Sequence, residues 1–252
     1  MMRTQGVSFS IARHAAWAPG LDTPQAWRDW ARAPFAIAGA DEPGVRMMAP
    51  MLRRRAGALG KMALEVAYQC LEQRADVPTV FCSRHGEVLR AVELLGCLAR
   101  GEPLSPTAFS MAVHNANAGL FSIARADRAN HIALAAGASS IEHAVIEACG
   151  LLADGAPMVL LVASDCPLPA PFGRFEDCAE QPHAWAWLMV AAGAAPITLT
   201  WSARAAPAGP DDAAAAAPAQ PGGLDVLRFQ LGDAARLERG AGARLWHWAK
   251  HA

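Results

Sequence analysis

The sequence lacks any apolar run long enough to cross a membrane. Its 252 residues are 53% hydrophobic, yet Gly, Pro or charged residues interrupt each apolar stretch, and residues 158–163 suffice only for a strand. A membrane helix requires about 20 such residues. The N-terminus also lacks the charged start, apolar run and cleavage site of a secretory signal. We therefore expect a cytoplasmic protein with no membrane span.

An excess of charge of either sign is also missing. The chain has 22 basic and 23 acidic residues, a formal net charge of −1, so no broad basic surface is expected for nucleic acid or an anionic membrane. The six cysteines form no Cys-x-x-Cys pair, which argues against a zinc site or a disulfide framework. We expect no metal, no cofactor, and reduced, mostly buried thiols.

The apolar pattern that is present predicts an α/β fold. A helix begins at Thr23-Pro24, with Thr23 as the N-cap. Short, continuously apolar strands alternate with longer helical patterns, which is typical of a sheet covered on both faces. The strands are predicted at residues 7–12, 78–83, 132–136, 158–164, 185–191 and 196–202, and further helices at 53–73, 86–100, 117–126 and 139–153.

Three segments follow from this pattern. Residues 1–203 form the α/β domain, whose last two strands are expected to pair as a hairpin. Residues 204–223 are rich in Ala, Pro and Gly and have the composition of a linker. Residues 224–252 form a short C-terminal element, predicted as a strand over 224–231 and a helix over 233–252.

The order of motifs from residue 83 to residue 202 resembles the N-terminal half of the β-ketoacyl synthases. Asn115 and Gly119 lead into a helix, residues 132–136 match an interface strand, residues 136–140 match a bend, and Asp154-Gly155 matches the closing turn. In that family the bend reads Thr-Ala-Cys-x-Ser and carries the acyl chain on its cysteine. Without a gap, Ala138 falls on the cysteine position, and a shift of one residue places Gly137 there.

This resemblance implies a thiolase-like layered sandwich, present here as the N-terminal half only plus the short C-terminal element. A ketosynthase needs an activated thiolate at the bend and two histidines from its C-terminal half. Neither Ala138 nor its neighbours Gly137 and Ser139 supply a thiol, and no histidine motif of that half follows residue 223. The resemblance therefore implies a protein that is not an enzyme by itself and has no catalytic residue.

A narrower resemblance comes from Ser105-Pro106-Thr107, His114-Asn115 and residues 160–163. These segments are similar to chain-length factors of aryl polyene and related pigment pathways. Such a subunit is expected to form a heterodimer with a catalytic ketosynthase, to meet an acyl carrier protein, and to form a homodimer in isolation. A lone half is also expected to expose a contiguous apolar surface to its partner.

The candidate pocket and interface residues lie around the interface strand. Their bulk or polarity would shape a neighbouring acyl pocket, although a plain core role is the alternative for the apolar ones, and a buried hydrogen-bonded pair for His114-Asn115. The set comprises Phe109, Met111, His114, Asn115, Leu120, Phe121 and His143.

Other functions remain open. Ser139 and His143 lie four residues apart on a predicted helix and could serve a serine acyl hydrolase or acyltransferase, although residues 137–141 break the Gly-x-Ser-x-Gly pattern and Ser139 is otherwise a helix N-cap. Arg84-His85-Gly86-Glu87 resembles the histidine phosphatase motif, without its second histidine segment. A stand-alone acyl-binding protein is a third alternative.

The run Arg53-Arg54-Arg55 could meet an acidic carrier protein, or be a solvated helix face.

Overall fold

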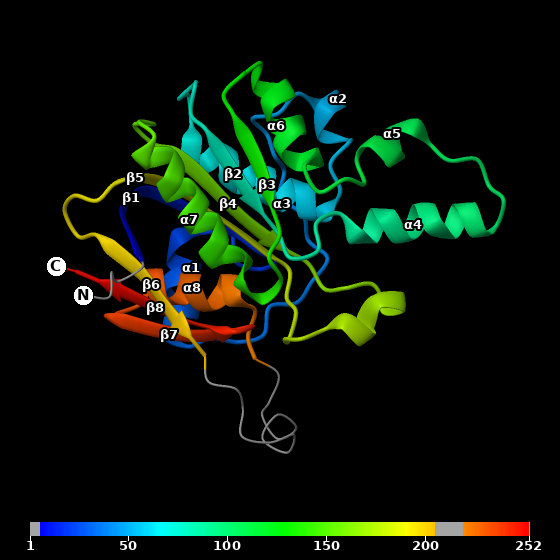
Figure 1. Ribbon diagram of the computed structural model, residues 1–252. Helices are drawn as coiled ribbons and strands as arrows, with labels where there is room; N and C mark the ends of the chain where they lie inside the picture. Colours follow the sequence, from blue (N-terminus) through cyan, green and yellow to red (C-terminus); the bar gives the residue numbers. More distant parts are fainter. Residues whose placement is uncertain (1–5, 205–218, 252) are drawn as a thin grey trace.

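The computed structural model describes residues 6–204 and 219–251 and contains one mixed sheet of eight strands (Figure 1). Their order across the sheet is β3-β2-β4-β5-β1-β6-β8-β7. The strands are β1 (Gly6–Trp17), β2 (Thr79–Cys82), β3 (His131–Leu134), β4 (Val159–Asp165), β5 (His183–Ala191), β6 (Ile197–Ala203), β7 (Arg236–Ala241) and β8 (Arg244–Lys250).

Strands β2, β3 and β4 form the parallel part of the sheet. β2 pairs with β3 on one side and with β4 on the other, both in parallel. All four residues of β2 and the first six of β4 are buried, as expected for parallel strands that helices cover on both faces. The remaining neighbours in the sheet are antiparallel.

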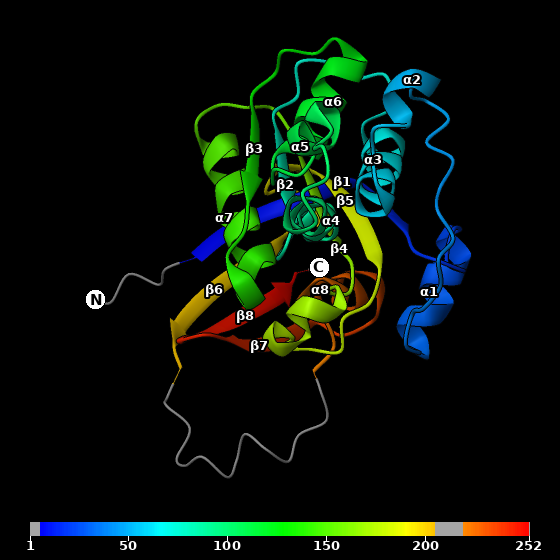
Figure 2. The same cartoon turned by 90° about the vertical axis from the view of Figure 1, so that its right-hand side faces the viewer.

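Helices cover the two faces of this sheet. The helices are α1 (Pro24–Arg32), α2 (Pro50–Arg53), α3 (Ala58–Leu71), α4 (Val88–Ala99), α5 (Pro106–Ser110), α6 (Ala116–Arg125), α7 (Ser140–Ala153) and α8 (Gly222–Leu231). Buried residues of α1, α7 and α8 share one hydrophobic cluster, and those of α3 and α6 share the other. In Figure 2 the strands run between α7 and α3. The predicted α/β, thiolase-like layering is confirmed.

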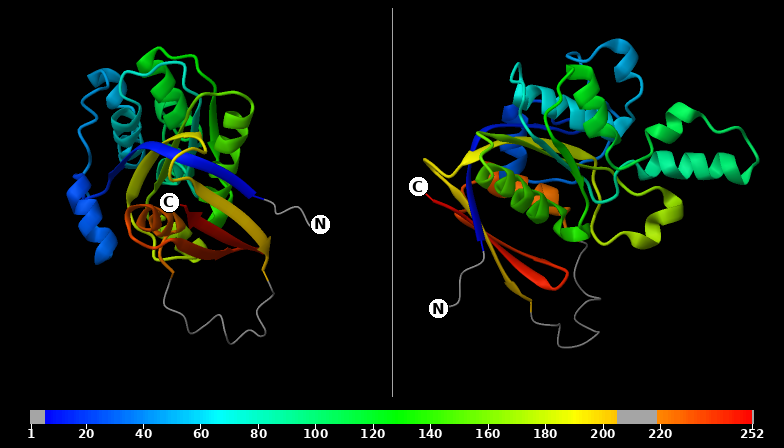
Figure 3. Two further views of the ribbon diagram at one scale, coloured as in Figure 1. Left: turned by 90° about the vertical axis from the view of Figure 1, so that its left-hand side faces the viewer. Right: turned by 45° about the horizontal axis from the view of Figure 1, so that its top comes forward.

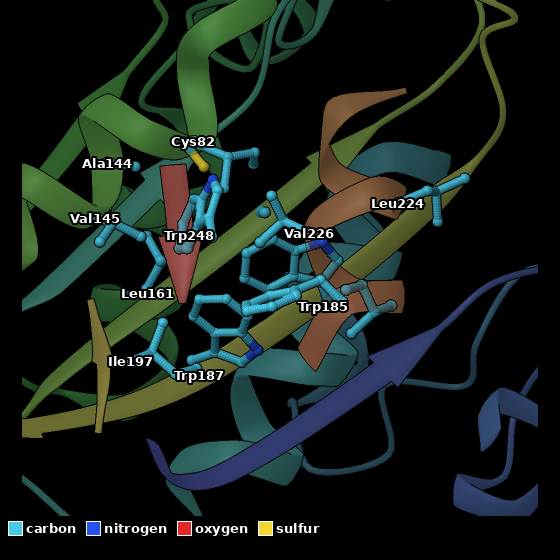
Figure 4. Packing of buried hydrophobic residues seen from close by; sticks show 14 of the residues in the cluster. Cys82, Ala144, Val145, Leu161, Trp185, Trp187, Ile197, Leu224, Val226 and Trp248 are labelled. Atoms are coloured by element: carbon cyan, nitrogen blue, oxygen red, sulfur yellow. The ribbon is translucent and has the colours of Figure 1, made fainter. Parts of the chain in front are cut away.

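Tryptophans dominate the core on the α7 side. Trp185 and Trp187, two residues apart on β5, lie with ring centroids 4.5 Å apart, because alternate residues of a strand face the same side. Trp248 of β8 approaches Trp187, and Leu224 and Val226 of α8 lie beside them (Figure 4). Residues after position 219 therefore help to build the main core.

Three predictions of local structure are wrong. The helix predicted over 53–73 is broken into α2 and α3, with Gly57 extended (ψ −176°) at the start of α3. Residues 224–231 form helix α8, since their dense apolar run fits either period. Residues 233–252 contain the β7–β8 hairpin, in which Trp246 and Trp248 alternate with less buried residues and Gly242 takes the turn at φ +56°.

The hairpin predicted between residues 185–191 and 196–202 is also absent, because β1 lies between these strands. β1 pairs with β5 from Phe9 to Trp17 and with β6 only from Gly6 to Phe9. The connection crosses β1 beside Ser10, whose hydroxyl accepts from the Gly193 amide (3.0 Å) and donates to the Ala194 carbonyl (3.2 Å). Predictions from sequence treat neighbouring segments as partners and miss a strand inserted from a distant segment.

Helices α4 and α5 project from the body as an arm (Figure 1, and Figure 3, right). No residue of either helix is buried. Strands β2, β4 and β5 are buried almost throughout, so the contiguous apolar surface expected of a lone half does not lie on their faces. Exposed apolar side chains gather instead on this arm. Across the described parts of the chain, no helix has the length and apolar content that a bilayer crossing requires.

Candidate functional site

The bend between β3 and α7 is the place that the sequence resemblance matches to the family's acyl-bearing cysteine. After β3 the chain forms a 3-10 turn, η1 (Gly137–Ser139), that leads directly into α7. Gly137 has φ +56°, a conformation that side-chain-bearing residues rarely adopt. The Ser140 hydroxyl accepts from the Ala136 amide (2.9 Å) and donates to the Gly137 carbonyl (2.8 Å), which fixes the turn.

Gly137 and Ala138 are both exposed at this bend. Ala138 borders a hollow of about 280 Å³ whose other walls include Arg84, Cys178 and Arg239. The bend therefore presents a methyl group and backbone atoms to this hollow, and no side chain of Gly137 or Ala138 can attack a thioester.

Ser139 and His143 contact each other, but not as a nucleophile and its base. The Ser139 hydroxyl donates to the Ala136 carbonyl (3.1 Å), and Nδ1 of His143 donates to the Ser139 carbonyl (2.9 Å). Among the described residues, no hydrogen bond joins the His143 ring to that hydroxyl, whereas a hydrolase requires one. Ser139 makes no side-chain cap on α7; Ser140 satisfies the backbone of the bend instead.

A buried charge cluster lies behind the bend, and sequence reasoning missed it. Glu142 is fully buried in the first turn of α7 and forms an ion pair with Arg239 of β7. Trp248 Nε1 donates to the same carboxylate oxygen at 3.4 Å. Arg239 also reaches the Ala138 carbonyl (3.4 Å) and Asp225 of α8 (3.5 Å). An acidic residue inside the apolar helix 139–153 was the only indication in the sequence.

Five of the six cysteines are not activated as nucleophiles. Burial raises the pKa of Cys70, Cys149 and Cys166 to about 12 in each case, and burial likewise raises the pKa of Cys82 and of Cys178 above the ordinary thiol value. A nucleophilic cysteine requires the opposite shift, toward the thiolate.

The predicted interface residues divide into core and surface. Met111, Leu120 and Phe121 are buried in the cluster under α3 and α6, so they have a core role. Phe109 is 65% exposed on α5.

The pair His114-Asn115 also separates. His114 is half-buried, and its Nε2 donates to the Ser83 carbonyl (3.0 Å), while Asn115 is exposed at the start of α6. The buried hydrogen-bonded pair is therefore wrong for Asn115.

Exposed apolar side chains are concentrated on the arm. Leu89, Leu95 and Leu98 of α4 are 55%, 56% and 61% exposed. Leu104, Phe109 and Val113, in and around α5, are exposed as well. Solvated leucine in this density usually marks a protein interface.

The charged and polar side chains of the segment Arg84-His85-Gly86-Glu87 contact other side chains of the protein. Arg84 pairs with Asp177, and Nε2 of His85 lies 3.2 Å from Glu180. Glu87 is buried, accepts from the Asn117 amide at 2.9 Å, and has its pKa raised by burial. Carboxylates of the protein thus already bind Arg84 and His85, the two side chains that a phosphatase would use on its substrate. Across the described residues, no three His, Cys, Asp or Glu side chains gather as metal ligands.

Three of the solved structures that are similar to this chain illustrate the likeness. A ketosynthase (ApeO) in complex with its chain length factor (ApeC) from Xenorhabdus doucetiae matches at a TM-score of 0.83 and 25% identity, over 96% of this chain and 99% of the other. The ishigamide ketosynthase/chain length factor matches at 0.60 and 15%, over 78% and 67%. A type II polyketide synthase acyl-carrier protein in complex with its hexaketide-bound ketosynthase (AntDE:AntF) matches at 0.55 and 13%, over 75% and 64%.

The family assignment comes from the sequence itself. Residues 27–249 match the model of the β-ketoacyl synthase N-terminal domain. Among curated proteins, none matches the sequence. Because the match spans most of the chain and the fold agrees with it, the protein belongs to the β-ketoacyl synthase family, through that family's N-terminal domain.

Proposed function

We propose that the protein is a non-catalytic, chain-length-factor-type subunit that forms a heterodimer with a catalytic β-ketoacyl synthase. The pathway would be polyketide-like or fatty-acid-like, of the aryl polyene type. The observation that carries this proposal is the bend itself. It keeps the strand, turn and helix order, with Gly137 and Ala138 at the turn; by the sequence resemblance, one of these two residues stands at the position of the family's thiol.

Chain length supports this role. Since 96% of this chain covers 99% of the matched chain in the ApeO–ApeC structure, the two are of nearly equal length. The chains matched in the other two structures are longer, and only 67% and 64% of them are covered. A chain that resembles one chain of a ketosynthase–chain length factor complex over almost all of its residues fits an auxiliary subunit.

The partner would meet the β3 edge of the sheet and the arm. The outer strand β3 has the sequence His-Ile-Ala-Leu and carries no Lys, Arg, Asp or Glu. The opposite outer strand, β7, exposes Arg236 and Glu238. Charged side chains protect an edge strand from further pairing, so β3 is the edge open to a partner. The leucines of α4 and Phe109 would extend that contact.

An experiment with the purified subunits tests the proposal. The protein alone should neither accept an acyl group from an acyl thioester nor hydrolyse it, whereas it should co-purify with a catalytic ketosynthase from the same genome and support condensation on carrier protein. The double variant L95D/L98D should abolish co-purification. Phe35→Asp, at a residue that is 57% exposed outside the arm, should not. Covalent acylation of the wild-type chain would overturn the proposal.

Ala138→Cys provides a further check on the position of the missing nucleophile. Ala138 is exposed beside the N-terminus of α7, where partial positive charge lowers thiol pKa values. The introduced thiol should react with iodoacetamide faster than any of the five native cysteines whose pKa is raised by burial. Mass spectrometry of the labelled peptides measures this difference.

A further inference from the structure

A large cavity lies along β1, away from the bend and the arm. Its volume is about 1010 Å³, which is at the upper end of the range for ligand sites. Residues 13–16 of β1 form one side, Trp27 of α1 and Leu231 of α8 form a second, and Tyr68 of α3 a third. We call this cavity the β1 groove.

One edge of β1 is unpaired within this groove. β6 leaves β1 after Phe9, while β5 continues along the other edge to Trp17. In the described chain, no strand pairs with that edge over residues 10–17, and the only additional bond to its main chain is the Cys70 thiol on the Arg13 carbonyl (3.5 Å). Figure 3 (left) views β1 from outside, with β6 turning away from it.

The open edge is regular enough to accept a strand. The irregularity in β1 lies between Ile11 and Arg13, and from Arg13 to Trp17 the register with β5 is continuous. Five residues of strand extend about 17 Å. Backbone amide and carbonyl groups on such an edge require partners, and an extended peptide supplies both in the right alternation.

The walls indicate what kind of segment fits. Apolar side chains of Val45, Met47 and Leu231 line the groove beside the rings of Trp27 and Tyr68. The Trp27 indole N–H and the Tyr68 hydroxyl have no hydrogen-bond partner among the described residues, and carbonyl groups of an added strand can accept from both.

Glu72 lies between Arg13 (2.6 Å) and Arg74 (3.0 Å). Because Asp22 and Glu65 also line the groove, its carboxylates and guanidinium groups nearly balance. A neutral segment with apolar side chains alternating toward Trp27 and Tyr68 therefore complements the groove better than a charged one.

We propose that the β1 groove binds an extended, apolar segment of a partner polypeptide, added as a strand to residues 13–17 of β1. This goes beyond the proposed function and does not depend on it. β1 is four strand positions from β3, or about 19 Å at the usual strand spacing. A segment bound here and a ketosynthase bound at β3 can therefore be held at the same time.

A phage-displayed library of random dodecapeptides, selected on the immobilised full-length protein, supplies the probe. An enriched peptide with alternating apolar residues should protect the amides of residues 13–17 from hydrogen exchange. Met47→Glu places a charge in the groove at a side chain that is 61% exposed, and should weaken peptide binding at least about tenfold. Met51→Glu, at a side chain that is 75% exposed outside the groove, should leave the affinity within about twofold.

Two synthetic versions of the peptide separate strand addition from side-chain binding. Each is N-methylated at alternate residues, in one register or in the other. Only the register whose amides face β1 should lose affinity, by at least about tenfold, because methylation removes the donors that pair with the edge. Equal effects in both registers, an absence of enriched peptides, or concentration-dependent protection of residues 13–17 without peptide would each overturn the proposal; the last result would assign the edge to a second copy of this chain.

Discussion

At the scale of single residues, the pair Glu142–Arg239 connects the bend to the C-terminal hairpin. The Glu142 side chain is 0% and the Arg239 side chain 9% exposed. Removal of one partner leaves the other charge buried and uncompensated, which typically costs about 3–5 kcal/mol. Arg239→Ala should therefore lower the free energy of unfolding by about that amount, as measured by urea denaturation. Arg236→Ala, at an exposed position on the same strand, should change the free energy of unfolding by less than about 0.5 kcal/mol. Equal losses in the two variants would show that the ion pair between Glu142 and Arg239 does not stabilise the fold more than a surface arginine does.

His183, another buried residue, predicts how stability depends on pH. Its Nδ1 donates to the Gln181 carbonyl (2.8 Å), its Nε2 has no hydrogen-bond partner within the described part of the chain, and burial lowers its pKa below 6.5. The unfolded chain therefore binds this proton more readily, and the free energy of unfolding falls as pH decreases from about 6.5 through the folded-state pKa. Burial and the Arg28 charge lower the pKa of His14 in the same direction.

The variant His183→Asn isolates this contribution, since its amide can still donate to Gln181. Between about pH 7.5 and about pH 5.5 it should lose less stability than the wild type, by at most about 1.4 kcal/mol per pH unit. Urea denaturation at several pH values measures both slopes. Parallel slopes would mean that His183 does not titrate differently in the two states.

At the scale of elements, the contact between α3 and α6 depends on a glycine. A Cβ on Gly60 would overlap Oδ1 of Asn117, the residue whose side-chain Nδ2 donates to the buried Glu87 carboxylate at 2.9 Å. Gly60→Ala should therefore destabilise the protein by about 1–3 kcal/mol, despite the better helix propensity of Ala. Gly150→Ala in α7 meets no atom within 4 Å and should instead stabilise it by about 0.5–1 kcal/mol. Thermal or urea denaturation of the two variants tests the opposite signs.

Elements with local determinants could be predicted from the sequence, and long-range pairings could not. Thr23 caps α1 as predicted, with its hydroxyl accepting from the Ala26 amide at 3.1 Å, because a cap involves only neighbouring residues. The insertion of β1 between β5 and β6 depends on contacts between residues 167 to 194 positions apart, from Trp17–Ala184 to Gly6–Thr200. The hairpin β7–β8 is set by its pairing with β6 and by the packing of Trp246 and Trp248, which no local pattern contains.

The site shows the same division. The bend follows from the spacing of small residues around Gly137, and the sequence placed it correctly between a strand and a helix. Arg239, 101 residues away along the chain, could not be assigned to Ala138 from the sequence, because only the folded hairpin brings it there. The β1 groove was equally inaccessible, since it exists only where β6 leaves β1.

At the scale of the whole molecule, the two described parts of the chain, residues 6–204 and 219–251, contribute strands to one sheet. β8 pairs with all seven residues of β6. Trp248, which is 1% exposed, lies 6.4 Å from Trp187 of β5 and 6.4 Å from Phe229 of α8. Because these contacts join segments distant in sequence, residues 219–251 should unfold together with residues 6–204 in a single transition.

Trp248→Ala tests this cooperativity. Loss of the buried ring should lower the free energy of unfolding by about 3–5 kcal/mol, and the transitions followed by far-UV circular dichroism and by fluorescence of the remaining tryptophans should shift together. Phe175→Ala, the matched truncation of an aromatic residue that is 51% exposed, should cost less than about 1 kcal/mol. If Trp248→Ala instead split the unfolding curve in two, the C-terminal segment would be an element of independent stability, and its ion pair to Glu142 could not hold the bend in place throughout unfolding.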